Sequence, residues 1–273
     1  MDTTSGYPSY DVFGYKMTPM TAEDQLELVA RQVEARERCV ISYLNVHGLH
    51  MLQQEPAMLE LHRAGITHVV IDGMPLIALC RIAGIRVTRQ HRVTNLDLIW
   101  PLLSLADKNG WRVYYVGSSQ QVVDLAMRAV HASLPTLRFR AHHGFIAIDC
   151  PNVIDDIAQF KADIVLVGLG MGMQERWIQK NIGSVPPTTM ISVGALLEYL
   201  AGAVRTPPRW MGPAGLEWLF RLLDDPRRFW RRYLIEPWGV AWILVARMAQ
   251  GRPRVIGSRS RALGAPISSR EPD

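Results

Sequence analysis

The stretch VVIDGMP (residues 69–75) places three β-branched residues directly before an aspartate and a glycine. A short apolar run of this kind predicts the end of a buried strand, so Asp72 stands where the strand gives way to a turn. Two interpretations of Asp72 are open. It caps the helix that follows, or it is a working carboxylate, either a general base or a ligand for a ribose.

Similar apolar runs recur along the chain and alternate with stretches of helical periodicity. We expect strands at 39–46, 67–72, 111–117, 137–143, 162–170 and 188–194. We expect helices at 21–37, 51–65, 74–84, 96–110, 119–134, 152–161, 174–181 and 195–202. Thr21, followed by Asp24 at the capping-box position, marks the start of the first helix. The alternation is typical of βαβ units and predicts an α/β fold with a mostly parallel sheet flanked by helices.

Shifts in composition divide the chain into four parts. Residues 1–20, rich in Ser, Thr, Tyr, Gly and Pro, are expected to form a flexible arm. The alternating pattern fills a core at 21–204, a helical appendage rich in Trp and Arg follows at 205–251, and a polar tail occupies 252–273. Between residues 205 and 254, ten arginines and no lysine oppose four acidic residues. Such a basic region attracts an anionic partner: nucleic acid, a membrane surface or a phosphorylated ligand.

Composition also limits the class of protein. The three cysteines, Cys39, Cys80 and Cys150, lie far apart in the sequence. This spacing argues against a zinc site or a disulfide framework and fits a reducing cytoplasm. The first twenty residues lack the pattern of a secretory signal, and no run of about 18 apolar residues occurs. We therefore expect a cytoplasmic protein without a spanning helix.

The carboxyl ends of the expected strands are where ligands bind in open α/β sheets. These ends carry polar side chains and glycines, whose backbone N–H groups can approach an anionic ligand. The candidates are Asn45, His47, Asp72, Gly73, Gly117, Gly168 and Gly170. The run VGLGMG (167–172) is not a dinucleotide fingerprint, because Met173 stands where the third glycine is required.

Two further stretches carry candidate site residues. The loop RQHRVTNLDL (89–98) contains Arg92 and Asp97. It is either a solvated basic loop before a helix capped by Asn95 or Asp97, or a clamp for a diphosphate, for which the arginine fork is well shaped. In GMQERW (172–177), Glu175 suits the N-terminus of a helix, whereas Gln174 could hydrogen-bond a sugar or a uracil edge.

The appendage has three interpretations. Its short amphipathic helices, with five tryptophans and many arginines, suit the headgroup region of anionic lipid. A packed helical subdomain is the second interpretation. A nucleic-acid surface is the third and is disfavoured, because lysine and a recognisable binding motif are missing. Pro226 and Pro237 fit the starts of helices, where the missing N–H has no consequence.

Seven stretches, taken together and in this order, resemble the WecG/TagA/CpsF family, glycosyltransferase family 26. They are LNVH (44–47), DGMP (72–75), RVTNLDL (92–98), YYVGS (114–118), ADIVLVGLGMGMQERWI (162–178), SVGALLEYLAGAVRTPP (192–208) and GLEWLFRLLDDPRRFWRRYL (215–234). The resemblance covers roughly residues 25–235. It implies a Rossmann-like core with a C-terminal helical appendage.

The resemblance also implies an activity. Members are inverting, metal-independent enzymes that move a sugar from a UDP-sugar to an undecaprenyl-diphosphate-linked sugar at the cytoplasmic membrane face. Asp72 matches the proposed catalytic base, and Arg92 matches an arginine that neutralises the UDP leaving group. The other matches are with substrate-binding residues, Gln174 and Glu175 at the donor site and Arg221, Arg228 and Arg231 at the lipid diphosphate.

Three places depart from the family pattern, at Tyr43, Asn95 and Gly172-Met173. They lie near the expected donor pocket. We therefore favour UDP-glucose, as in members that build exopolysaccharide repeat units, over UDP-N-acetylmannosamine or its uronic acid.

The remaining expectations concern cofactors and partners. No D-x-D sequence occurs in the chain, so we expect no metal and no cofactor. Arginines and helix N-termini can stabilise a leaving diphosphate instead. We expect peripheral binding to an anionic membrane surface and no nucleic-acid partner, and a homo-oligomer stays open. The alternative function is a nucleotide- or nucleic-acid-binding module without transfer chemistry.

Overall fold

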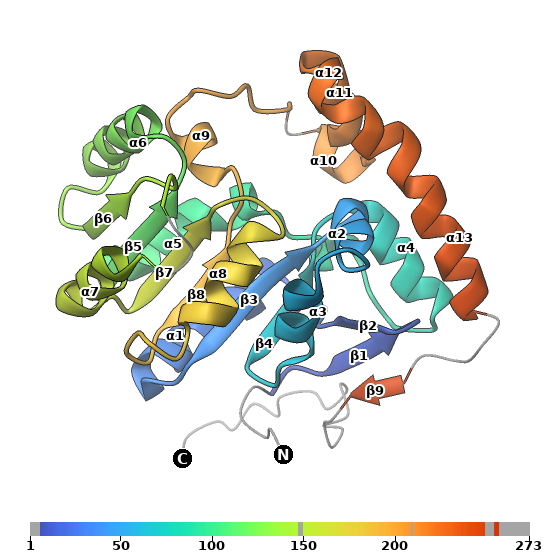
Figure 1. Ribbon diagram of the computed structural model, residues 1–273, viewed down its shortest axis with the longest axis horizontal. Helices are drawn as coiled ribbons and strands as arrows, with labels where there is room; N and C mark the ends of the chain where they lie inside the picture. The colour runs from blue at the N-terminus through green and yellow to red at the C-terminus, as the bar shows by residue number, and fades with distance from the viewer. Residues whose placement is uncertain (1–5, 147–149, 209, 249–253, 257–273) are drawn as a thin grey trace, which may run out of the picture.

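A six-stranded parallel sheet forms the centre of the computed structural model, which describes residues 6–146, 150–208, 210–248 and 254–256. Its strand order is β4-β3-β8-β7-β5-β6 (Figure 1). The strands are β3 (Cys39–Leu44), β4 (Thr67–Ile71), β5 (Arg112–Gly117), β6 (Arg138–His142), β7 (Ile164–Gly168) and β8 (Thr189–Ser192). Each pairing between neighbours is parallel. The expected α/β fold and its six strands are confirmed.

Helices cover both faces of the sheet. One layer contains α1 (Ala22–Ala35), α5 (Asn95–Lys108), α6 (Gln120–Ser133) and α9 (Leu196–Leu200). The opposite layer contains α3 (Pro56–Arg63), α7 (Pro151–Phe160) and α8 (Met173–Asn181). Successive strand residues serve the two layers in turn: Tyr115 packs into the first and Tyr114 into the second. Apolar residues on both faces of a strand are the pattern of a buried parallel sheet.

A third apolar cluster lies at the β4 edge, beneath α2 (Val46–Met51) and α4 (Met74–Ile82). The N-terminal segment belongs to this cluster. β1 (Ser9–Val12) and β2 (Tyr15–Met17) form an antiparallel hairpin, and β9 (Arg254–Ile256) pairs with β1. The expectation of a flexible arm is wrong for residues 9–20, because five of its apolar side chains are buried, those of Val12, Phe13, Tyr15, Met17 and Met20. Residues 1–5 and most of the expected polar tail lie outside the described residues.

Helix starts follow local capping chemistry. Thr21 caps α1, and Asp24 completes the capping box as expected. The cap of α5 is Thr94 rather than Asn95 or Asp97; Asp97 instead accepts a hydrogen bond from the Thr94 backbone N–H at 3.1 Å. The helix expected at 51–65 begins only at Pro56, as α3, because proline fits the first position of a helix, and Val46–Met51 forms the separate helix α2.

The appendage is helical, as expected. α10 (Met211–Ala214) and α11 (Glu217–Asp224) precede a continuous helical run made of α12 (Pro226–Trp230), the π-helical turn η2 (Arg231–Ile235) and α13 (Glu236–Met248). Pro226 begins α12, but Pro237 lies inside the run and starts no helix. It follows the π turn, where Glu236 N–H bonds to the carbonyl of Arg231 and the regular helical ladder is already interrupted.

The helix α13 lies against the core beside α2 and α4 (Figure 1). Val240 is buried in the cluster at the β4 edge, and Arg247 donates from Nη1 to the carbonyl of Phe13 at 3.0 Å. Arg247 also stacks over the ring of Tyr15. The appendage is thereby fixed to the N-terminal hairpin. No helix in the described part of the chain is long and apolar enough to cross a membrane.

Candidate functional site

Two cavities meet at the carboxyl ends of β3 and β4. The first has a volume of about 630 Å³ and a polar lining; it extends over the ends of β7 and β8 and beneath α11 and α12. The second, of about 480 Å³, is mostly apolar and lies between α2, α4 and α13. Five residues line both cavities: Asn45, His47, Asp72, Arg221 and Arg232. The sheet edge expected to bind ligands therefore has two chambers with a shared set of polar side chains.

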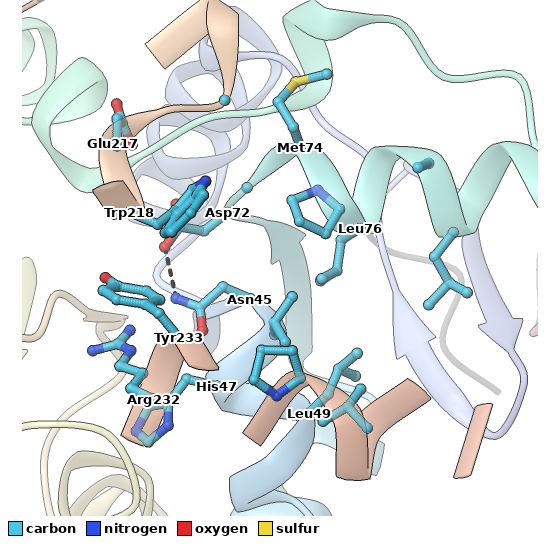
Figure 2. A pocket seen from close by; sticks show the side chains of 18 of the residues that line it. Asn45, His47, Leu49, Asp72, Met74, Leu76, Glu217, Trp218, Arg232 and Tyr233 are labelled. Carbon is cyan, nitrogen blue, oxygen red and sulfur yellow. Dashed lines mark hydrogen bonds between the residues drawn. The ribbon is translucent and has the colours of Figure 1, made fainter. Parts of the chain in front are cut away.

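Asp72 stands at the junction of these chambers. Its backbone N–H bonds to the carbonyl of Leu44 at 2.9 Å, which continues the β3–β4 pairing by one residue. Its Oδ2 accepts a hydrogen bond from Nδ2 of Asn45 at 3.0 Å (Figure 2). The N-cap of α4 is Gly73, at a φ of 121°, and α4 has no side-chain cap. The helix-cap interpretation of Asp72 is therefore wrong, and Gly73 is needed for its backbone conformation.

Asn45 and His47 approach Asp72 from the end of β3. Asn45 is the N-cap of α2, and its Oδ1 accepts from the backbone N–H of Gly48 at 3.0 Å. Nδ1 of His47 lies 2.5 Å from Oε2 of Glu236, the first residue of α13. Burial, together with the nearby Arg232 charge, lowers the pKa of His47. His47 thus joins the core to the appendage at the site.

Arg92 lies beneath the appendage, with only 10% of its side chain exposed. Its guanidinium is 3.5 Å from Oε1 of Glu217 and 3.7 Å from Oδ2 of Asp97. Burial raises the pKa of Glu217, while the Arg92 charge opposes that rise. A Cβ at Gly212 would come within 2.6 Å of Arg92 Nη2, so a larger residue in α10 would displace the Arg92 guanidinium. Arg92 lines the apolar cavity, whereas Asp97 lines neither and serves the α5 capping box.

Gln174 and Glu175 form a buried brace at the start of α8. Glu175 Oε2 accepts from the Gly172 N–H at 2.6 Å, and its Oε1 accepts from Gln174 Nε2 at 2.7 Å. Gln174 Oε1 accepts from the Gly194 N–H at 3.0 Å, which ties the β7–α8 turn to the turn after β8. Burial raises the pKa of Glu175. Of these two residues, Gln174 lines the polar cavity and Glu175 does not, so Glu175 supports the site by holding Gln174 in place.

The candidate glycines separate into two groups. Gly170 lines the polar cavity, and Gly73 lines the apolar one. Gly117 and Gly168 line neither. A Cβ at Gly117 would lie 2.4 Å from the Gly168 carbonyl oxygen, so this pair permits close approach of the ends of β5 and β7. Gly117 and Gly168 are therefore explained by the packing of these two strands.

The appendage supplies the cationic wall of the polar cavity. Arg221, Arg228 and Arg231, the three arginines named from the sequence, line it. Arg232, which sequence reasoning missed, lines both cavities and lies near Tyr233 and His47 (Figure 2). Its spacing of four residues from Arg228 on one helical run is the signal that could have found it.

Two of these arginines are half-buried, and each has a buried atom without a hydrogen-bond partner in the described part of the chain. The Nε atoms of Arg221 and Arg232 have no hydrogen-bond partner among the described residues. Burial lowers the pKa of Arg232. Buried guanidinium donors that face a cavity are suited to bind an anionic group such as a diphosphate.

Comparison with known proteins agrees with this geometry. A model of the glycosyl transferase WecG/TagA/CpsF family matches residues 10–254. The chain is 30% identical over 165 residues to the N-acetylglucosaminyldiphosphoundecaprenol N-acetyl-beta-D-mannosaminyltransferase of Staphylococcus aureus strain NCTC 8325, and 29% identical to that of strain MRSA252. The aligned stretch spans 60% of this chain and 64% of the relatives' length. The family model covers most of the sequence, and the chain belongs to the WecG/TagA/CpsF glycosyl transferase family.

Proposed function

We propose that this chain is an inverting glycosyltransferase that moves a hexose from a UDP-sugar to a polyprenyl-diphosphate-linked sugar in surface polysaccharide or exopolysaccharide synthesis. The observation that carries the proposal is the position of Asp72, a carboxylate held by Asn45 where a polar and an apolar cavity meet. Membership of the family and the names of the Staphylococcus aureus relatives support it.

The chemistry follows from this placement. The donor occupies the polar cavity, and the acceptor hydroxyl reaches its anomeric carbon on the face opposite the UDP. As the hydroxyl oxygen bonds to that carbon, the bond to the UDP oxygen breaks and its electron pair leaves with UDP. Asp72 accepts the proton of the hydroxyl. A single base is sufficient here, because UDP leaves as an anion and needs no general acid, unlike the leaving group of an inverting glycosidase.

Arginines stabilise the departing diphosphate in this proposal. Arg221 and Arg232, which are half-buried, and Arg228 and Arg231, which are exposed, line the polar cavity and give it a positive charge that stabilises an anionic leaving group. Arg92 lines the adjoining apolar cavity, where Asp97 and Glu217 lie close to its guanidinium, and it adds positive charge near the junction of the two cavities. Gln174 and Gly170 line the polar cavity, where they contact the UDP-sugar.

The donor sugar is a narrower proposal. The relatives are named for N-acetylmannosaminyl transfer. Two of the positions where this chain departs from the family pattern, Tyr43 and Asn95, line the polar cavity. Tyr43 is buried, and its hydroxyl donates to Gln25 Oε1 at 2.7 Å, so a rigid ring stands where the donor binds. Glucose as the transferred sugar stays a prediction from the sequence.

The test is a transfer assay with a panel of UDP-sugars and a polyprenyl-diphosphate-linked glucose or N-acetylglucosamine, scored for UDP release and for glycosylated lipid with EDTA present. Asp72→Asn should abolish transfer and leave UDP binding and the melting temperature close to wild type. Asp124→Asn, which changes an exposed carboxylate on α6, is the matched control. Unchanged turnover in Asp72→Asn would overturn the assignment of the base. UDP binding without transfer from any donor would favour the alternative, a nucleotide-binding module.

A further inference from the structure

The apolar cavity extends away from Asp72 between two helices. α4 supplies one wall and α13 the other, and α2 closes the inner side near Leu49 (Figure 2). The apolar lining residues are Val46, Leu49, Met74, Leu76, Leu79, Ile82, Leu234, Val240 and Leu244. From Met74 to Ile82, α4 advances by about 12 Å, at 1.5 Å per residue. The cavity is therefore a groove that continues well beyond the reacting atoms.

The polar lining is confined to one end of this groove. Asp72, Arg92, Arg221 and Arg232 lie together near the start of α4, next to the polar cavity. At the other end of α4, Ile82 is 63% exposed, so the groove opens to the surface beside an apolar side chain. One end suits an anionic group, and the rest suits a hydrocarbon chain.

Small residues keep the groove open between the two helices. Ala78 on α4 and Ala241 on α13 both line it and are both exposed. On α13, residues 237, 240, 241 and 244 face the groove, which is one helical stripe. The other side of that helix carries Trp238 and Trp242, each more than 75% exposed. A chain that leaves the groove would emerge beside this aromatic surface.

We propose that the groove between α4 and α13 binds the isoprene units adjacent to the diphosphate of the acceptor lipid. This inference rests on the proposed function and deepens it, because it assigns a binding site to a part of the acceptor that does not react. The diphosphate lies at the arginine end, the first isoprene units fill the groove, and the rest of the chain stays in the membrane that α13 faces. The acceptor sugar is then held at Asp72 because the diphosphate and the first isoprene units of the acceptor are both bound.

The first test fills the groove. Ala241→Trp places a large side chain across the groove, at an exposed position. Ala246→Trp, the control, adds the same side chain at an exposed position of α13 outside the groove. KM is measured for two sugar-diphosphate acceptors, one with a polyprenyl chain and one with a short alkyl chain. In wild type the polyprenyl acceptor should have the lower KM. Ala241→Trp should raise the ratio of the polyprenyl to the short-chain KM by about tenfold or more, and Ala246→Trp should not.

The second test does not depend on turnover. A geranylgeranyl diphosphate with a diazirine on its second isoprene unit is photolysed with the full-length protein, and the labelled peptides are mapped by mass spectrometry. Label in residues 74–82 and 236–248, lost in Ala241→Trp, supports the groove.

Three outcomes would overturn the inference, and each is distinct from failure of the proposed function. Label confined to Trp238 and Trp242 would mean that the chain stays in the membrane. An unchanged KM ratio in Ala241→Trp, with wild-type transfer intact, would exclude the groove while the glycosyltransferase proposal stands. Absence of label combined with a change of oligomeric state in Ala241→Trp would assign the groove to a second copy of this chain. Groove labelling in a protein that transfers no sugar would refute the proposed function alone.

Discussion

Nδ2 of Asn45 donates to Oδ2 of Asp72 at 3.0 Å, across the carboxyl ends of two neighbouring parallel strands. The other polar atom of the Asn45 side chain, Oδ1, caps α2 by accepting a hydrogen bond from the Gly48 N–H. The amide is therefore held at both ends, and it fixes one oxygen of the carboxylate. The position of Asn45 at the end of a strand suggested contact with a ligand, whereas the geometry favours a role in positioning the proposed base.

Asn45→Asp separates these two roles of Asn45. Aspartate is as good an N-cap as asparagine, so the melting temperature should change little. The donor to Asp72 is lost and a second negative charge appears beside it, which disfavours ionised Asp72. We expect kcat to fall by about 10²-fold and the acid limb of the pH–rate profile to move to higher pH. An unchanged profile would show that Asn45 does not position the base.

Arg92→Lys tests the buried guanidinium. Arg92 reaches two carboxylates, those of Asp97 and Glu217, and an ammonium group is too compact to serve both. We expect the transfer rate to fall on the order of 10²-fold, because a point charge replaces a fork near the leaving group. Arg89→Lys, on an exposed residue outside both cavities, should retain the wild-type rate. A wild-type rate in Arg92→Lys would make Arg92 purely structural.

Arg232→Gln tests the arginine that sequence reasoning missed. Its half-buried side chain lines both cavities, and its Nε lacks a partner among the described residues. Removal of the charge should reduce kcat by about 10²-fold or more if the guanidinium stabilises the diphosphate that leaves. Arg227→Gln, an exposed neighbour on α12 that lines neither cavity, is the control. Equal rates in both variants would exclude Arg232 from the site.

Local patterns predicted most of the fold. Runs such as residues 162–170 are buried on both faces, so their apolar composition identifies parallel strands without knowledge of their neighbours. The capping box of Thr21 and Asp24 is equally local and was found. The strand order was not predicted, because β3 pairs with β8, about 150 residues later, and no local signal encodes that partner.

Long-range packing also explains where the predictions from the sequence were wrong or incomplete. The hairpin at residues 9–17 becomes ordered by burial against the β4 edge, although its composition is typical of a loose segment. Gly117 and Gly168 fit the pattern of ligand-binding turns but serve the packing of β5 on β7. Asp72 and Asn45 were both placed at strand ends by the sequence, but they lie 27 residues apart, and the hydrogen bond between them became recognisable only in three dimensions.

Stability should depend on pH through His62, which lies far from solvent beneath β3. Its Nε2 lies 2.8 Å from Oγ of Ser42, and burial lowers the pKa of His62 to about 3. The folded state therefore holds neutral histidine, while the unfolded chain binds a proton near pH 6.5. This contribution to stability is complete above pH 6.5 and is lost as pH falls from there toward 3, by about 1.4 kcal/mol per pH unit.

Urea unfolding between pH 7 and pH 4.5 measures that dependence. His62→Gln keeps a polar partner for Ser42 and removes the titration, so the fall of the unfolding free energy with decreasing pH should become shallower. His131→Gln, on the exposed side of α6, should leave the slope unchanged. The same slope in wild type and His62→Gln would assign the acid sensitivity to other groups.

Membrane binding should depend on the outer side of α13. Trp238 and Trp242 are 77% and 78% exposed, which is unusual for tryptophan in water and typical of side chains at a lipid interface. The exposed arginines Arg227 and Arg228 on the preceding helix add attraction to anionic headgroups. The double variant Trp238→Ser/Trp242→Ser should sediment about tenfold less with phosphatidylglycerol vesicles and should keep its far-UV circular dichroism. Trp100→Ser, a partly exposed tryptophan on α5, is the control. Retained sedimentation of the double variant would place the membrane contact elsewhere. If the double variant no longer binds vesicles but still transfers sugar to a detergent-solubilised acceptor, this surface recruits the enzyme to lipid without taking part in the reaction.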